Sequence, residues 1–412
     1  MSPDSPSSYA RRDVLRLGAG AAAALVAARA VGGSPAAAVT APSAPATAVP
    51  SGPILKPLPT EWFTPFGTNA EMRWDSVDPR RYLTAPERLF VRNHTSTPVI
   101  DAATWELRIH GDGLADPRTA ERAHVLTYRD LLRLPARTAT TVLECTGNGR
   151  SFFATQQGTP ASGTAWQLGA VGTVRWTGVP LSLVLRRLGL RRDAVDVQAT
   201  GLDAPYVSGG VDYGAVRRPF PVAKAVDDAL LVYAMNGRPL LPDHGFPVRL
   251  LLPGWIGIAS IKWLGELEVS RSTLTSPWNT KWYRMTGPAY PADAPPLTVT
   301  PVKSAFELAR GAEIPAGRRT VLTGRSWSGA APVRRVEVST DGGETWGAAR
   351  LGRRRGEGWT QWSYPWRPRG SGEHVLLARA TDAAGRTQPD EVPFNDGGYF
   401  FSAVVRHPVA VA

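Results

Sequence analysis

The stretch TVLECTGNGRS, residues 141–151, contains the only cysteine of the 412-residue chain, Cys145. The residues before it have strand character, and the Gly-Asn-Gly sequence after it predicts a turn in which the backbone can approach a ligand closely. One cysteine forms no internal disulfide and excludes zinc or iron–sulfur sites that need four cysteines. Two interpretations remain: a buried, hydrophobe-like cysteine, or a thiolate that serves a metal or a reaction, with the fixed charge of Arg150 nearby.

Composition indicates a folded protein of two or three domains. Hydrophobic residues make up 43% of the chain and charged residues 20%, while 37 prolines and 41 glycines favour β-structure and loops over a helical bundle. The net charge of +12 is spread along the chain without a recognisable nucleic-acid module. Attraction of an anionic substrate or an acidic partner explains this charge as well, so we expect no nucleic-acid partner.

Residues 1–38 are predicted to be a twin-arginine export signal. The pair Arg11-Arg12 precedes an apolar stretch and a run of small residues. The alternative is an uncleaved anchor helix, but the stretch is shorter than the roughly 20 residues that span a bilayer, and Arg29 interrupts it. We therefore expect a periplasmic or extracytoplasmic protein without a stable membrane span. Residues 39–57, rich in Ala, Pro, Ser and Val, are expected to form a disordered linker.

The rest of the chain divides into three parts that differ in residue pattern and composition. Residues 58–275 alternate short apolar runs, turns and a few helical patterns, which predicts a mixed α+β domain in which residues 258–264 form a buried strand. Residues 276–300 are rich in proline and predict an extended connector. Residues 301–412 contain alternating strand patterns and the hairpin signal Asp341-Gly342-Gly343, which predicts an immunoglobulin-like β-sandwich.

Four segments place polar side chains in apolar surroundings: residues 89–94, 141–151, 242–262 and 278–284. Each one alone has an ordinary structural explanation, such as a satisfied core histidine or a capping aspartate. Together they offer a thiolate, several cations and hydrogen-bond donors, which suit a large anionic cofactor and a small oxyanion. The usual signatures of serine hydrolases, phosphate loops, dinucleotide-binding folds and zinc proteases are missing from the sequence.

These segments resemble the sulfite oxidase family of molybdenum enzymes. The similar stretches are FVRNH (90–94), ECTGNGR (144–150), DHGFPVR (243–249) and IKWLG (261–265), in the family's order, and the resemblance covers about residues 60–412. It implies an α+β molybdopterin-binding catalytic domain followed by an immunoglobulin-like dimerisation domain. It also implies a molybdenum–molybdopterin cofactor and a homodimer.

The resemblance further implies roles for individual residues. Cys145 would supply the protein's thiolate to molybdenum. The residues implied to hold the pterin and its phosphate are Asn93, His94, Asp203, His244, Arg249, Ser260 and Lys262. The residues implied to line the substrate pocket are Arg92, Arg150, Trp166 and Tyr283.

The implied reaction is oxidation of sulfite to sulfate by oxygen-atom transfer, with electrons passed to an external acceptor such as cytochrome c. Gly149 stands where many family members have a second arginine, and residues 394–399 lack an arginine that animal members contribute. Lys281 and Arg284 are candidates to replace that charge. The alternatives are a related molybdoenzyme acting on another small oxo-substrate, or an exported β-sandwich binding protein without catalytic activity.

Overall fold

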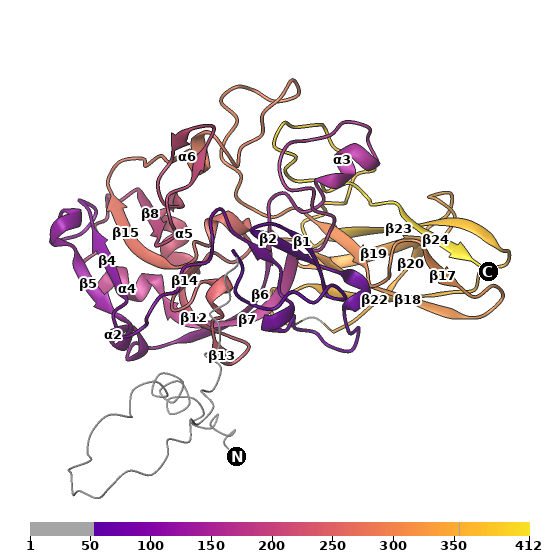
Figure 1. Cartoon of the computed structure of the whole chain (residues 1–412), viewed down its shortest axis with the longest axis horizontal. Helices are drawn as coiled ribbons and strands as arrows, with labels where there is room; N and C mark the ends of the chain where they lie inside the picture. Colours follow the sequence, from indigo (N-terminus) through magenta and orange to yellow (C-terminus); the bar gives the residue numbers. More distant parts are fainter. Residues whose placement is uncertain (1–52, 354) are drawn as a thin grey trace, which may run out of the picture. The chain divides into compact units, whose positions relative to one another are not determined.

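The computed structural model describes residues 53–353 and 355–412. The predicted export signal and most of the predicted linker lie outside the described residues. An α+β portion comes first in the described chain, and a β-sandwich follows it at the orange and yellow end of the chain in Figure 1.

The first portion contains a sheet in the order β11-β8-β15-β4-β5 and a second in the order β13-β12-β7-β6, with β14 paired to β12. Strands β15 and β4 run parallel, and their other neighbours in the first sheet run antiparallel. A small antiparallel sheet, β1-β2-β3, and the hairpin β9–β10 complete this portion. The strands are β1 (Phe63–Phe66), β2 (Asn69–Met72), β3 (Val91–Arg92), β4 (Glu106–His110), β5 (His124–Thr127), β6 (Arg137–Glu144), β7 (Val171–Pro180), β8 (Asp196–Gly201), β9 (Val207–Ser208), β10 (Val211–Asp212), β11 (Arg217–Pro221), β12 (Leu230–Met235), β13 (Arg238–Pro239), β14 (Arg249–Leu251) and β15 (Leu264–Ser270).

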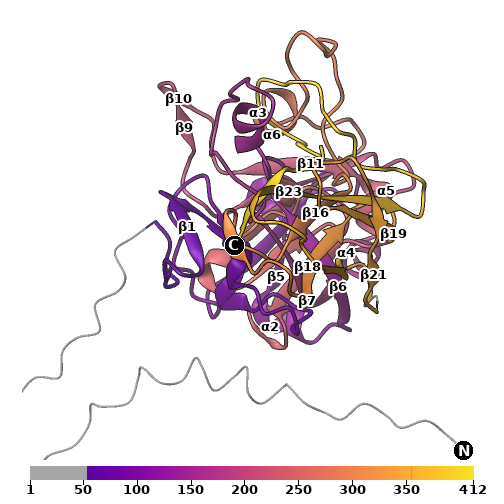
Figure 2. The same cartoon turned by 90° about the vertical axis from the view of Figure 1, so that its right-hand side faces the viewer.

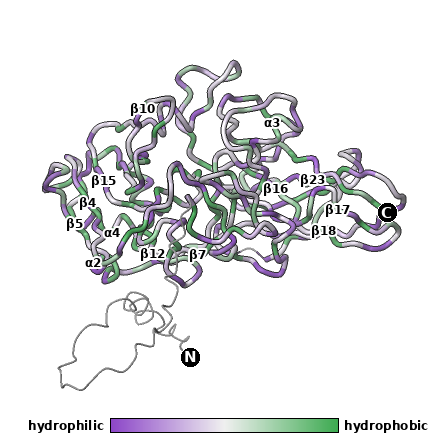
Figure 3. Tube along the Cα trace, in the orientation of Figure 1, coloured by the Kyte–Doolittle hydropathy of each residue, from purple (hydrophilic) through white to green (hydrophobic). Residues whose placement is uncertain are grey.

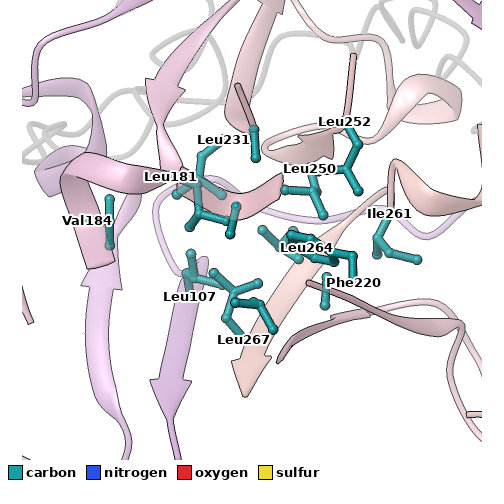
Figure 4. Packing of buried hydrophobic residues seen from close by; sticks show 14 of the residues in the cluster. Leu107, Leu181, Val184, Phe220, Leu231, Leu250, Leu252, Ile261, Leu264 and Leu267 are labelled. Atoms are coloured by element: carbon teal, nitrogen blue, oxygen red, sulfur yellow. The ribbon is translucent and has the colours of Figure 1, made fainter. Parts of the chain in front are cut away.

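Short helices connect these strands. They are α2 (Tyr128–Leu132), α3 (Ser151–Thr155), α4 (Leu181–Arg187), α5 (Val222–Asp227) and α6 (Pro277–Thr280). In α4, Leu181, Val184 and Leu185 have helical spacing and are buried together with Leu107 of β4 and Leu267 of β15 (Figure 4). Each such leucine contributes about 1.5 to 3 kcal/mol by leaving water, so this core fixes the sheets that carry the polar segments.

The second portion is the predicted sandwich. Its sheets have the orders β16-β18-β22-β21 and β17-β24-β23-β19-β20, and the predicted turn at residues 341–343 lies between β19 and its antiparallel partner β20. The predicted fold class is therefore confirmed. The strands are β16 (Lys303–Phe306), β17 (Ala312–Ile314), β18 (Thr320–Trp327), β19 (Val333–Ser339), β20 (Gly347–Ala348), β21 (Arg350–Leu351), β22 (Thr360–Trp366), β23 (Gly372–Asp382) and β24 (His407–Val411).

The strand predicted at residues 258–264 is wrong. A 3-10 turn, η5 (Gly257–Ala259), and a bend occupy this stretch, and β15 begins only at Leu264. Local polar contacts replace part of the sheet ladder: Leu252 N–H donates to Ser260 Oγ (3.1 Å), and Arg249 Nη2 donates to the Ser260 carbonyl (2.8 Å). The irregular backbone places Ser260 and Lys262 beside the same hollow.

Residues 53–57, expected at the end of a disordered linker, are instead packed against the first portion. The backbone N–H groups of Leu55 and Lys56 donate to the Asp243 carboxylate (2.9 and 2.7 Å), and Ile54 is buried. Composition alone predicted disorder, but a buried carboxylate far along the chain satisfies this backbone. The predicted connector, residues 276–300, likewise includes helix α6.

No helix among the described residues is long and apolar enough to cross a membrane. Hydrophobic and hydrophilic residues alternate along most of the described trace (Figure 3).

Candidate functional site

The turn after β6 holds Cys145 in a fixed position. Its N–H donates to the Ala170 carbonyl (2.9 Å), its own carbonyl accepts from Asn148 N–H (2.9 Å), and 8% of the residue is exposed. Gly149 has φ of +95°, a conformation that favours glycine, and its N–H donates to the Gln167 carbonyl. The sequence therefore predicted both the strand and the turn correctly at this point.

Residues of the sandwich contact this turn through a buried polar network. The Lys303 ammonium of β16 pairs with the Glu144 carboxylate (2.9 Å) and donates to the Asn148 carbonyl (2.7 Å). Trp327 of β18 donates its indole N–H to the other carboxylate oxygen of Glu144 (2.9 Å), and Asn148 Nδ2 donates to the first (2.9 Å). The side chains of Lys303 and Glu144 are 2% and 1% exposed, so this ion pair is shielded from water.

Two hollows adjoin at Cys145. The first, of about 690 Å³, is called here the cation-lined cavity; its predicted residues are Asn93, His94, Asp203, His244, Arg249, Ser260 and Lys262. The second, of about 930 Å³, is called the aromatic cavity; its residues include Arg150, Trp166, Tyr206, Trp282 and Tyr399. Both volumes include the open mouth. The residues common to both are Arg92, Asn93, His94, Cys145 and Tyr283, so the structure brings all twelve predicted site residues to one of the two hollows.

The cation-lined cavity holds positive groups whose burial is only partly offset by the carboxyl groups of Asp203 and Asp243. Burial lowers the pKa of Arg249 to about 9, and its guanidinium donates to the His244 (3.2 Å) and Ser260 carbonyls. Burial, and then the charge of Arg249, lower the pKa of Lys262 well below its ordinary value. The Lys262 ammonium donates to the Asp243 carbonyl (2.9 Å) and to Asn93 Oδ1. Such groups favour an anion that neutralises them.

Two further side chains of this cavity suit a hydrogen-bonding ligand. Burial raises the pKa of Asp203 to about 6, so this carboxyl is poised to accept or to share a proton. The hydroxyl of Thr146, directly after the cysteine, is buried and has no hydrogen-bond partner. An unpaired buried hydroxyl costs about 1 to 3 kcal/mol unless a ligand satisfies it.

A hydrogen-bonded cluster lies at the wall between the cavities. Trp278 Nε1–H donates to His94 Nε2 (3.2 Å), and because an indole N–H can only donate, the His94 proton resides on Nδ1. Burial lowers the pKa of His94 well below its ordinary value, and the charges of Arg92 and Lys262 lower it further, so His94 is neutral. Tyr283 Oη lies 3.3 Å from Arg92 Nη2 and 3.4 Å from His94 Nε2.

Arg150 lines the aromatic cavity, and glycines pack closely around its side chain. A Cβ at Gly147, Gly163 or Gly398 would fall 3.0 Å or less from the Arg150 side chain. The guanidinium donates through Nε to the Gly397 carbonyl (2.9 Å) and through Nη1 to the Thr164 carbonyl (2.8 Å). The loop at residues 397–398 therefore positions this arginine.

The two proposed replacements for the missing arginine lie elsewhere. Lys281 is exposed and donates to Tyr213 Oη (2.8 Å), and Arg284 donates to the carbonyls of Thr280 and Ala292. Neither side chain lines the aromatic cavity. The expectation that one of them restores the charge is therefore not supported by the geometry.

Sequence reasoning missed three aromatic residues of the second cavity. Tyr206 precedes the β9–β10 hairpin, Trp282 follows α6, and Tyr399 lies beyond the sandwich strand β23. Tyr399 stacks on Tyr283 with ring centroids 5.2 Å apart. Trp282 was the nearest to being found, since the polar segment 278–284 contains it. Tyr399 follows the turn sequence Asn395-Asp396-Gly397-Gly398, and Tyr206 precedes Gly209-Gly210, but a turn pattern alone does not indicate which cavity the aromatic ring lines.

Comparison with known proteins identifies the family. Residues 94–278 match the oxidoreductase molybdopterin binding domain, and residues 299–409 match the Mo-co oxidoreductase dimerisation domain. Sulfite oxidase of Gallus gallus is 36% identical over 332 residues, which cover 76% of this chain and 69% of that protein. The chain belongs to the sulfite oxidase family. The predicted family and its molybdenum–molybdopterin cofactor are thus confirmed.

Other relatives place limits on this likeness. The mitochondrial sulfite oxidase of Homo sapiens is 34% identical over 329 residues, covering 76% of this chain but 58% of that protein. The sulfane dehydrogenase SoxCD from Paracoccus pantotrophus superposes with a TM-score of 0.69 at 25% identity, covering 87% of this chain and 91% of that chain. The chain thus spans between 58% and 69% of the length of these curated sulfite oxidases.

The cation-lined cavity fits the family's cofactor. Molybdopterin carries a phosphate, dithiolene sulfurs and a ring rich in donors and acceptors. The cavity offers the buried cations Arg249 and Lys262 for the phosphate, Asp203 and the unpaired Thr146 hydroxyl for polar groups, and Cys145 as a soft ligand for the metal.

Proposed function

We propose that this family member oxidises sulfite to sulfate and delivers the two electrons singly to a separate acceptor such as cytochrome c. The observation that supports this proposal is the position of Cys145, on the wall shared by a cavity suited to the cofactor and a cavity with two arginines. The balanced reaction is sulfite plus water to sulfate, two protons and two electrons. When bound, the cofactor supplies the oxygen-atom transfer and accepts both electrons.

The residues of the cation-lined cavity hold the cofactor in this proposal. Cys145 binds the metal, and the buried cations bind the phosphate by charge-assisted hydrogen bonds. Neutral His94 donates from Nδ1, because Trp278 occupies its Nε2 with a hydrogen bond. The cofactor-holding residues proposed are Asn93, His94, Asp203, His244, Arg249, Ser260 and Lys262.

The residues of the aromatic cavity orient the substrate. Arg92 and Arg150 bind the anion, and Trp166, which is 1% exposed, forms a rigid wall that excludes water. Burial raises the pKa of Tyr283 above its ordinary value, so its hydroxyl keeps its proton. That hydroxyl lies between Arg92 and His94, where it can donate to an oxygen of the anion or pass a proton.

The test combines metal analysis with turnover. Protein made in a host that synthesises the cofactor is expected to contain about one molybdenum per chain, to reduce ferricyanide when sulfite is added, and to give a Mo(V) paramagnetic signal on partial reduction. Molybdenum-free protein from such a host would contradict the assignment of the cofactor to this cavity. Molybdenum without sulfite turnover would contradict the substrate alone.

We also propose a homodimer that is exported by the twin-arginine route. The match of residues 299–409 to a dimerisation domain supports the homodimer, and Arg11-Arg12 with the apolar stretch behind it supports export. Light scattering on the purified protein tests the first, with a monomer as the contrary result. Cell fractionation of the double variant Arg11→Lys/Arg12→Lys tests the second, because accumulation in the cytoplasm is expected.

A further inference from the structure

The aromatic cavity is much larger than sulfite. A water molecule occupies about 30 Å³ in the liquid, so an anion of four non-hydrogen atoms takes roughly 100 Å³. The hollow measures about 930 Å³ when the open solvent at its mouth is counted, and its lining includes Cys145 and the rings of Tyr206 and Trp282. Its lining therefore offers more surface than a four-atom anion can contact.

The rings of Tyr206 and Trp282 are fixed by their aromatic neighbours. Tyr206 and Trp282 pack edge to face with centroids 5.6 Å apart, and Trp282 packs against Tyr213 at 4.7 Å. Tyr206 and Tyr213 flank the β9–β10 hairpin, which extends from the body of the molecule (Figure 2). Because these rings hold one another in place, they form a surface suited to an apolar or aromatic group.

The charge of this cavity is low for a dianion. Arg150 already donates Nε and Nη1 to backbone carbonyls, and Arg92 contacts Tyr283. At the position where many family members have a second arginine, a Cβ on Gly149 would lie 3.1 Å from the Cβ of Phe401, and φ is +95°. An arginine there would be strained in this chain, and a monoanion matches the donors that are present better.

An organic sulfinate, R–SO₂⁻, has the properties that these observations require. It carries one negative charge, keeps the lone pair on sulfur that makes sulfite reactive, and adds a group R. We propose that this enzyme oxidises organic sulfinates to sulfonates, with R against Tyr206 and Trp282. This inference rests on the proposed oxygen-atom transfer.

The reaction balances with water and a one-electron acceptor. One sulfinate and one water give one sulfonate, two protons and two electrons: a sulfur–oxygen bond forms, the two O–H bonds of water break, and the carbon–sulfur bond stays intact. Two equivalents of a one-electron acceptor, such as ferricyanide, take up the electrons.

The experiment compares benzenesulfinate, methanesulfinate and sulfite as substrates of the molybdenum-loaded protein, with ferricyanide as acceptor and the sulfonate identified by mass spectrometry. We expect kcat/KM for benzenesulfinate to equal or exceed that for sulfite, and methanesulfinate to be poorer than benzenesulfinate. Titration calorimetry with the product, benzenesulfonate, gives a second readout that needs no turnover.

Variants of the two rings test where R binds. Trp282→Ala is expected to lower the ratio of kcat/KM for benzenesulfinate to that for sulfite about tenfold. Should that variant fail to fold, Tyr206→Ala provides the test at matched molybdenum content, because the Tyr206 ring also packs against His94 (5.2 Å). Trp346→Ala is the matched control, because Trp346 packs under Arg379 in the sandwich, away from the cavity. It should leave the ratio unchanged.

The outcomes separate the two proposals. Sulfite turnover without sulfinate turnover overturns this inference and leaves the proposed function standing. Sulfinate turnover without sulfite turnover supports the inference and removes sulfite as the substrate. Turnover of neither by molybdenum-loaded protein overturns both. Benzenesulfinate turnover whose ratio to sulfite is insensitive to Trp282→Ala and to Tyr206→Ala overturns the assigned position of R.

Discussion

The cation-lined cavity and the aromatic cavity meet at Cys145, but they hold their positive charges differently. In the first, Arg249 and Lys262 are buried, donate to backbone carbonyls and have pKa values lowered by burial. In the second, Arg150 also donates to backbone carbonyls but lies over the ring of Tyr399, and Arg92, which lines both cavities, contacts Tyr283. Cations that are unfavourable without a counter-charge suit a ligand that stays bound, whereas the second arrangement suits a ligand that enters and leaves.

The largest effect is expected from a substitution of Cys145, which lines both cavities. Cys145→Ser replaces the proposed soft sulfur ligand by a hydroxyl, and we expect loss of turnover by at least about a thousandfold, with an altered or absent Mo(V) signal. Turnover and the paramagnetic spectrum are measured on protein of matched molybdenum content. Full activity in this variant would mean that Cys145 is only a packing residue.

The next largest effect is expected at the buried Lys303–Glu144 pair beside the turn of Cys145. Lys303→Met leaves the Glu144 carboxylate buried without its cation, which costs about 3 to 5 kcal/mol of unfolding free energy. We expect a lower melting temperature and a shifted Mo(V) spectrum, because Glu144 precedes the cysteine that we propose binds the metal.

Arg325→Met is the matched control. It breaks another ion pair of the sandwich, Arg325–Glu307, whose side chains are 1% and 2% exposed. This variant should lose stability without changing the Mo(V) spectrum. A spectrum that is the same in Lys303→Met and wild type would show that the sandwich stabilises the fold without positioning Cys145.

The sequence predicted the cation-lined cavity better than the aromatic one. Its residues come from short stretches in which glycine, proline and charged residues stand together, as in DHGFPVR at residues 243–249. Three contacts join segments more than 100 residues apart: Lys56 with Asp243, Lys303 with Glu144, and Tyr399 with Tyr283. Such contacts depend on tertiary packing and leave no local pattern.

A third prediction separates the two cavities. Lys262→Met removes the charge-assisted contact that we propose Lys262 makes to the cofactor's phosphate. Such a contact is worth about 1.5 to 3 kcal/mol, so its loss should weaken cofactor retention roughly 10- to 100-fold. The molybdenum that remains after gel filtration measures this loss. Lys281→Met is the control, since Lys281 lies outside both cavities. Equal retention in the two variants would remove Lys262 from the cofactor site.

A pH experiment examines the backbone that carries Trp166. Glu71 accepts N–H groups from Gln167 (2.9 Å) and Gly169 (3.2 Å), and burial raises its pKa to about 7. Because the folded-state pKa is raised, the contribution of Glu71 to stability is full below its ordinary value near 4.5 and is lost as pH rises through about 7. Glu71→Gln does not titrate.

Relative to wild type, the unfolding free energy of Glu71→Gln should therefore rise by about 2 kcal/mol between pH 5 and pH 8, as measured by urea unfolding. Glu313→Gln, on an exposed position of β17, serves as the control. A constant difference between Glu71→Gln and wild type across this range would mean that Glu71 is ionised at both pH values.

The smallest expected effect belongs to the aromatic cavity alone. Arg150→Lys keeps a positive charge but loses the planar fork that donates to the Gly397 and Thr164 carbonyls while facing the anion. We expect kcat/KM for the preferred anion to fall about tenfold, mainly through KM, with molybdenum content equal to wild type. If molybdenum is lost together with activity, Arg150 also holds the cofactor and the division into two cavities fails. If KM is unchanged and only kcat falls, Arg150 acts on the reacting anion and not on its binding. Arg92 would then be the arginine that binds the exchanging anion.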